Sequence, residues 1–381
     1  LETIREATVA LSSNEMQGRG TAQPGADRAA RYLADQFAKL GLKPRGDAST
    51  YLQAINFKIT QVMPESSVKA GDATLKHGED FVVPPPYTSD QVDAAGGLVF
   101  AGYGIAAPEL KHDDLSGLDL KGKIVVVVTG QPKNVDKAAW EKVAGLQKVI
   151  INMITRGAAG IIIGNVGTKD QPYTLLANYL ARRNVAPAGA PEPAFKLPPF
   201  VLASDAALEK LFAGTGATYA QTLEKAANGE NVSRELNKQA SVTLRVKREQ
   251  GASSNVVGFL EGADPKLKEE AVVYSAHYDA YGVGADGRVY PGAADNALGT
   301  AMILGIAEAF AKSPVKPRRS VIFLAVTGEE YGLLGAEHWV KNPTWPIEKV
   351  AANLNFDGIG TEIYGPVKRV VGIGVEHSDL G

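Results

Sequence analysis

The 381-residue chain contains no cysteine. Without cysteine the protein can form no disulfide, use no thiolate nucleophile and bind no metal through sulfur. Any metal site must therefore draw its ligands from histidine, aspartate and glutamate, and the chain has only five histidines. The absence does not identify the compartment, because an exported protein can also do without cysteine.

The chain also lacks an excess of either charge and any long apolar run. Its 40 basic and 42 acidic residues give a formal net charge of −2, which gives no reason to expect nucleic acid or an anionic membrane as a partner. No apolar run approaches the roughly 20 residues that span a bilayer. Because the sequence begins with Leu1 rather than Met, we expect that an N-terminal segment has been removed, either in trimming or as a signal peptide. The second case predicts a secreted or periplasmic protein.

Sequence patterns divide the chain into three stretches. Apolar residues recur at helical spacing between Ala26 and Leu40, and Gly41 follows as a C-terminal cap. Residues 62–240 are rich in glycine, proline and short β-like runs. After residue 241, strands are expected at 242–248, 255–260, 271–276, 320–326 and 350–356, and helices at 297–312 and 332–341. This alternation predicts an α/β domain with a mixed, mostly parallel central sheet flanked by helices. We expect residues 1–61 and 241–381 to form that domain, discontinuously, around an inserted β-rich domain at 62–240.

Side chains that can bind metal follow apolar strands in four places. They are His277, Asp279, Asp295, the adjacent pair Glu329 and Glu330, and Asp357. The glutamate pair comes directly after the strand at 320–326 and has no basic residue beside it. In open α/β sheets, ligands bind outside the carboxyl ends of the strands. We therefore expect these side chains to converge on one crevice.

Each of these residues, taken singly, also has an ordinary structural explanation. Asp295 fits the N-cap of the helix expected at 297, the glutamate pair suits the first turn of the next helix, and Asp357-Gly358 suits a turn. A lone histidine is more often a surface or hydrogen-bonded core residue than a ligand. All these coincidences together are improbable, because unpaired carboxylates at the edge of a core are costly. A cluster of histidine and carboxylates suits zinc or another borderline divalent ion, and so many carboxylates favour two ions over one.

Several motifs resemble a known family. "SAHYDA", "GAADNALG", "TGEEYGLLGA" and "NFDGIG" closely resemble the co-catalytic di-zinc aminopeptidases of the M28 type, as do "SNVVGFLEG" and the N-terminal stretch "LSSNEMQGRGTAQPGADRAARYLADQFAKLGLKP". The insert, with "LVFAGYGI", "LKGKIVVVVTG" and "RGAAGIIIG", is similar to a protease-associated (PA) domain. The resemblance covers nearly the whole chain. It implies a zinc-dependent exopeptidase that hydrolyses N-terminal residues from peptides.

The same resemblance implies a role for each candidate residue. One zinc would be bound by His277 and Asp357 and the other by Glu330, while Asp295 would bridge both. Glu329 would be the general base that takes a proton from the metal-activated water, and Asp279 would orient His277. The family also implies a cis peptide between Asp295 and Asn296, which is rare outside proline.

The chain departs from the family pattern at one ligand. The family needs a second histidine on the Glu330 zinc, and only His377 follows Asp357 before the sequence stops at Gly381. We expect His377 to be an ordinary surface residue and the missing ligand to lie in a C-terminal part beyond residue 381, which would leave the second zinc site incomplete in this chain. Two alternatives stay open: a metallo-carboxypeptidase that acts on acidic peptides, and a non-catalytic relative of the receptor type. Neither the oligomeric state nor the side-chain preference can be inferred from the sequence.

Overall fold

The computed structural model describes residues 1–85, 89–191, 197–284 and 287–358, and these form two compact units. The first unit comprises Leu1–Ile59, Val185–Ala190 and Gln250–Gly381, and the second comprises Thr60–Asn184 and Pro191–Glu249. The boundaries expected at 62 and 240 therefore shift, because the chain enters and leaves the second unit along continuous strands, β2 (Leu52–Val62) and β13 (Arg234–Leu260). His377 lies outside the described residues.

The first unit is built on a sheet with strand order β18-β14-β17-β13. Strands β14 (Ala271–His277), β17 (Ser320–Val326) and β18 (Val350–Asn355) run parallel, and β13 pairs antiparallel with β17. The short strand β1 (Lys43–Pro44) also pairs with β13, antiparallel. The expected mixed, mostly parallel sheet is confirmed.

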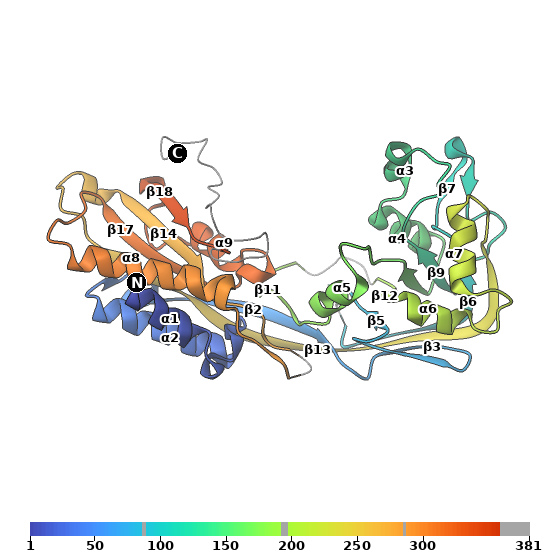
Figure 1. The fold of residues 1–381 in the computed structure, drawn as a ribbon, viewed down its shortest axis with the longest axis horizontal. Coiled ribbons are helices and arrows are strands. Elements are labelled where there is room, and N and C mark those ends of the chain that lie inside the picture. Colours follow the sequence, from blue (N-terminus) through green and yellow to red (C-terminus); the bar gives the residue numbers. More distant parts are fainter. Residues whose placement is uncertain (86–88, 192–196, 285–286, 359–381) are drawn as a thin grey trace. The chain divides into compact units, whose positions relative to one another are not determined.

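Helices cover both faces of this sheet because its central strand is apolar on both sides. Phe323 and Ala325 of β17 are buried with the helices α1 (Glu2–Leu11), α2 (Pro24–Lys39) and α8 (Leu298–Lys312), which lie together in Figure 1. The alternate residues Ile322 and Leu324 face the other side, where Trp339 of α9 (Leu334–Lys341) packs. Successive side chains of a strand point to opposite faces, so a strand buried on both faces appears in the sequence as a continuous apolar run.

One segment of the expected insert belongs to the first unit. Strand β11 (Asn184–Pro187) pairs with β2, and Val185 is buried with Ile55, Phe57 and Ile59 of that strand. The backbone continues this contact, since the Ala188 N–H donates to the Asn56 carbonyl at 2.9 Å. Residues 185–190 therefore complete the first unit although they lie in the middle of the stretch expected to be the insert.

The second unit has a sheet of its own with helices packed against it. Its strand order is β13-β6-β9-β10-β12-β5, with β6 (Gln91–Phe100), β9 (Ile124–Val128), β10 (Gly160–Gly164) and β12 (Phe200–Ala203) parallel to one another. At its edges, β5 (Phe81–Val82) pairs antiparallel with β12, and β3 (Ser67–Ala70) pairs antiparallel with both β13 and β4 (Ala73–Lys76). The helices are α3 (Lys137–Val143), α4 (Leu146–Thr155), α5 (Tyr173–Leu180), α6 (Asp205–Phe212) and α7 (Tyr219–Ala227). None of the helices in the described ranges combines the length and apolar character that a bilayer crossing needs.

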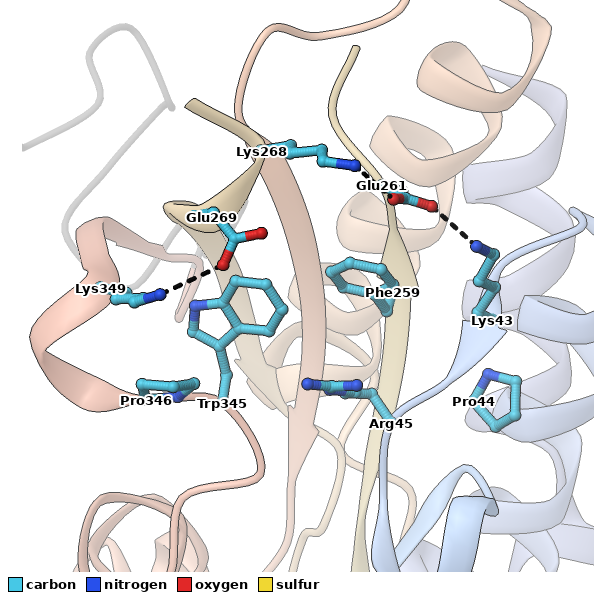
Figure 2. Close-up of a pocket in the computed structure, with 10 residues that line it drawn as sticks. All are labelled: Lys43, Pro44, Arg45, Phe259, Glu261, Lys268, Glu269, Trp345, Pro346 and Lys349. Carbon is cyan, nitrogen blue, oxygen red and sulfur yellow. Dashed lines mark hydrogen bonds and ion pairs between the residues drawn. The ribbon is translucent and has the colours of Figure 1, made fainter. Parts of the chain in front are cut away.

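A pocket of about 430 Å³ lies at the amino ends of the parallel strands of the first unit (Figure 2). Arg45 lies over the rings of Trp345 and Phe259, at 5.1 and 5.5 Å from their centroids. The charges around it pair with one another: Glu261 with Lys43 and Lys268, and Glu269 with Lys349. This pocket is at the opposite end of the sheet from the residues that the sequence singles out.

Candidate metal centre

His277 is the last residue of β14 and lies beside the end of β17. Its partner across the parallel pair is Val326, and its side chain is only 2% exposed. The main-chain carbonyl of His277 accepts a hydrogen bond from Thr300 Oγ1 of α8 at 2.7 Å. Strand pairing and this bond together fix the position of the imidazole at the carboxyl edge of the sheet.

Two aspartates from separate loops meet the imidazole of His277. Its Nε2 lies 3.1 Å from Asp295 Oδ1 and 3.1 Å from Asp357 Oδ1. The three side chains form the group among the described residues whose ligand atoms lie close enough together for one metal ion. Ligands about 2.0–2.1 Å from a tetrahedral zinc lie about 3.3 Å from one another, so the observed spacing fits such an ion.

The adjacent glutamates form a short turn at the end of β17. Gly328 begins this turn with φ +71°, a conformation that glycine adopts without strain, and Glu329–Tyr331 follow as one 3₁₀ turn. Glu329 Oε2 lies 3.8 Å from His277 Nε2, farther than the aspartate oxygens, and its side chain is 26% exposed. Glu330 Oε1 is buried and has no hydrogen-bond partner among the described residues. The two carboxylates therefore have different surroundings, and the buried oxygen of Glu330 fits a metal ligand.

Asp279 occupies a fully buried position behind His277. The Nδ1 of His277 lies 3.1 Å from the main-chain carbonyl of Asp279 and 3.7 Å from its carboxylate. The carboxylate itself accepts hydrogen bonds from the Glu329 N–H at 3.2 Å and from Thr21 Oγ1 at 2.9 Å. Asp279 thus contacts the imidazole mainly through its backbone, and its side chain joins the glutamate turn to the N-terminal segment.

The pKa values reflect a crowded cluster of acids around one imidazole. Burial opposes protonation of His277, but hydrogen bonds to Asp279, Asp295 and Asp357 outweigh it and raise the pKa to about 12. Burial raises the pKa of Glu330 to about 7 and also raises that of Glu329. The hydrogen bond to His277 lowers the pKa of Asp357. Several carboxylates gathered around one buried imidazole, two of them with raised pKa values, are typical of a site that binds a cation.

Three further buried residues hold the site together, and no local sequence pattern indicated their roles. Asn296 donates through Nδ2 to the Phe356 carbonyl at 2.8 Å, which ties the Asp295 loop to the residue before Asp357. Arg19 and Thr21, from the N-terminal end of the chain, donate hydrogen bonds to Tyr278 and Asp279 in the loop after β14. The peptide between Asp295 and Asn296 is cis, as the family resemblance implied.

Comparison with known proteins gives a family match for the part of the chain that carries the cluster. The model of Peptidase family M28 matches residues 255–377. Among curated proteins, transferrin receptor protein 2 of Mus musculus is 27% identical over 283 residues, which is 69% of this chain and 33% of that protein. The chain thus spans about a third of the length of that relative.

Solved structures show the same fold. An aminopeptidase from Aneurinibacillus sp. strain AM-1 matches with a TM-score of 0.59 at 21% identity, over 95% of this chain and 71% of that chain. The zinc aminopeptidase BSAP from Bacillus subtilis matches with a TM-score of 0.55 at 20% identity, over 95% and 70%. At this level of identity the likeness concerns the fold alone. Residues 255–377 thus match the model of peptidase family M28, in a chain that has the fold of these aminopeptidases.

Proposed function

We propose that this chain is a zinc-dependent exopeptidase that removes N-terminal residues from peptides. The observation that supports this most directly is that His277, Asp295 and Asp357 meet at the carboxyl edge of the sheet, where one potential ligand atom from each lies within 4.8 Å of the other two. The family match over the same residues and the aminopeptidase fold add to it.

The donor set of the site suits zinc. A neutral imidazole and carboxylate oxygens are common zinc ligands. His277 and Asp357 would hold one ion and Glu330 a second, and Asp295 would be a ligand of both. The buried Oε1 of Glu330, which has no hydrogen-bond partner in the described part of the chain, supports the assignment of Glu330. Zinc, when bound, supplies Lewis-acid chemistry that polarises a carbonyl and makes water more acidic.

Residues of the chain itself transfer the protons and orient the reacting groups. Glu329, partly exposed beside the cluster, takes the proton of the attacking water on its carboxylate and returns it to the leaving amine. Asp279 accepts from the imidazole through its carbonyl and holds the Glu329 backbone through its carboxylate. Both contacts reduce the freedom of groups that must stay aligned during the reaction.

An assay of two substrate types, with and without chelator, tests this function. Hydrolysis of aminoacyl-4-nitroanilides that a chelator abolishes and zinc restores supports the aminopeptidase. Cleavage of N-blocked acidic dipeptides instead would show the carboxypeptidase alternative. Zinc binding without hydrolysis of either substrate would show a receptor-type relative, and hydrolysis unaffected by chelator would refute the metal mechanism.

The identity of the insert and the location of the protein are proposals of their own. We propose that the second unit is a PA domain, on the strength of its "LVFAGYGI" and "LKGKIVVVVTG" motifs. We propose that the protein is exported to the periplasm or secreted. Fractionation of the native cells tests the export, and protein found only in the cytoplasmic fraction would refute it.

A further inference from the structure

Arg19 is a fully buried cation whose hydrogen bonds all go to main-chain carbonyls. Its side chain is 0% exposed. Nε donates to Tyr278 O at 2.6 Å, Nη1 donates to Leu11 O and to Pro291 O, the latter at 2.8 Å, and Nη2 donates to Gly292 O at 2.7 Å. Four of the five guanidinium N–H groups therefore donate hydrogen bonds to main-chain carbonyls.

Three of these carbonyls belong to the two loops that present metal ligands, and the fourth, Leu11 O, is at the end of α1. Tyr278 directly follows His277. Gly292 has φ +56° and starts the turn that contains Asp295, and its carbonyl also accepts from the Ala297 N–H at 3.0 Å. A single planar guanidinium thus spans the loop after β14 and the loop before α8.

The two residues after Arg19 extend the same contact. Gly20 forms a parallel bridge with Ala280, and Ala280 N–H donates to the Arg19 carbonyl at 3.3 Å. Thr21 Oγ1 donates to the Asp279 carboxylate at 2.9 Å. That carboxylate also accepts from the backbone of Glu329. Residues 19–21 therefore contact two of the four loops that carry the site directly, and they reach a third, the glutamate turn, through Asp279.

The choice of arginine follows from this geometry. A guanidinium presents its donors in a rigid plane, whereas the ammonium of lysine is a compact point charge on a flexible stem. Burial lowers the pKa of Arg19 to about 10, opposed by Asp279, Asp295 and Glu330, so the side chain remains a cation at neutral pH. The cost of burying a cation is offset because its donors are satisfied and an acidic cluster lies nearby.

We propose that Arg19 and Thr21 are positioning residues of the metal centre, which set the spacing between the His277 loop and the Asp295 loop and thereby the affinity for zinc. This inference rests on the proposed metal-dependent function. Partners that orient the ligands of a metal typically change its affinity 10- to 100-fold when they are lost. The N-terminal segment, more than 250 residues away along the chain, is on this view part of the active-site framework.

The test compares the variants Arg19→Lys and Thr21→Val with the wild-type chain. Zinc affinity is measured by competition with a chromogenic chelator, and the visible absorption of the Co²⁺-loaded protein reports ligand geometry. We expect roughly 10- to 100-fold weaker zinc binding for Arg19→Lys, roughly 10-fold weaker for Thr21→Val, and altered Co²⁺ bands in both. Ser320→Ala is the matched control, because Ser320 is buried and hydrogen-bonded at the amino end of β17. It should lower stability and leave zinc affinity unchanged.

The outcomes separate this inference from the proposed function. Wild-type protein that binds no zinc would refute the proposed function itself. Wild-type protein that binds zinc, with both variants equal to it in affinity and Co²⁺ spectrum, would refute the positioning role alone. If Arg19→Lys does not fold by circular dichroism, Thr21→Val decides: wild-type affinity and spectrum in that variant overturn the proposal.

Discussion

Replacement of each adjacent glutamate by glutamine should have opposite effects on metal binding and catalysis. The change keeps the size of the side chain and removes its charge. Glu329 Oε2 lies 3.8 Å from the imidazole of His277 and its side chain is partly exposed, so it is free to exchange a proton with water and substrate. Glu330 Oε1 is buried and has no hydrogen-bond partner within the ranges that the structure describes, which leaves it available to a cation. We expect Glu329→Gln to lose turnover and Glu330→Gln to lose metal.

The magnitudes follow from these surroundings. Zinc sites with four protein ligands bind with roughly 10–16 kcal/mol of apparent free energy, or about 3 kcal/mol per ligand. Since each 1.4 kcal/mol is about tenfold, Glu330→Gln should weaken its zinc about 100-fold. Loss of a general base costs roughly 10²- to 10⁴-fold in rate, so Glu329→Gln should lower kcat by that factor and change zinc affinity no more than about threefold.

Two measurements on each variant decide the matter. Zinc content after dialysis against a chelator of graded strength gives the affinity, and nitroanilide release at saturating zinc gives kcat. The wild-type chain and Ser320→Ala serve as controls. Metal loss in Glu329→Gln together with normal zinc affinity in Glu330→Gln would refute the division of roles.

Three further predictions concern stability. Zinc at a hundredfold excess over its Kd should stabilise the first unit by about 2.7 kcal/mol, and a chelator should remove that gain in thermal unfolding; an identical melting temperature in both conditions would refute a tight site. Phe323→Ala should lower the free energy of unfolding, measured by urea titration, by about 3–5 kcal/mol, because Phe323 is fully buried and its ring stacks on that of Tyr274 at 5.8 Å. The control Val315→Ala, at an exposed site, should change the free energy of unfolding by less than about 0.5 kcal/mol. Burial lowers the pKa of His77 to about 4 from its ordinary value of about 6.5. Between these two pH values the unfolded state binds more protons than the folded state. The free energy of unfolding of the second unit should therefore fall by at most about 3 kcal/mol as the pH drops through this window. His77→Phe should remove this acid sensitivity in urea titrations at pH 7.5 and 4.5, and an unchanged pH dependence would contradict it.

Local patterns were enough to predict most elements of the first unit. The apolar run at 320–326 is β17, and the stretch expected as a helix at 297–312 is α8 from Leu298 to Lys312. Burial on both faces makes a strand continuously apolar, and burial on one face gives a helix its period, so both signals lie within a few consecutive residues. The placement of candidate ligands after strands was visible for the same reason.

The sequence was less informative where an element crosses between units. Strands were expected at 242–248 and 255–260, but the structure has one strand, β13, from Arg234 to Leu260. The stretch between them carries charged and exposed residues, which interrupt the apolar pattern without ending the strand. The pairing of β11 with β2 was likewise hidden, because strand partners that are far apart in sequence leave no local periodicity.

The sequence alone determined which side chains could bind a metal: the absence of cysteine limits the ligands to histidine and carboxylates, and strand ends place them at one edge of the sheet. Only the tertiary structure decided how those side chains meet. It brings Asp295 and Asp357 to equal distances from His277, and it closes Arg19 and Thr21 onto the loops behind them. Local burial is encoded in neighbouring residues, whereas contacts across more than 250 residues depend on how every intervening element packs.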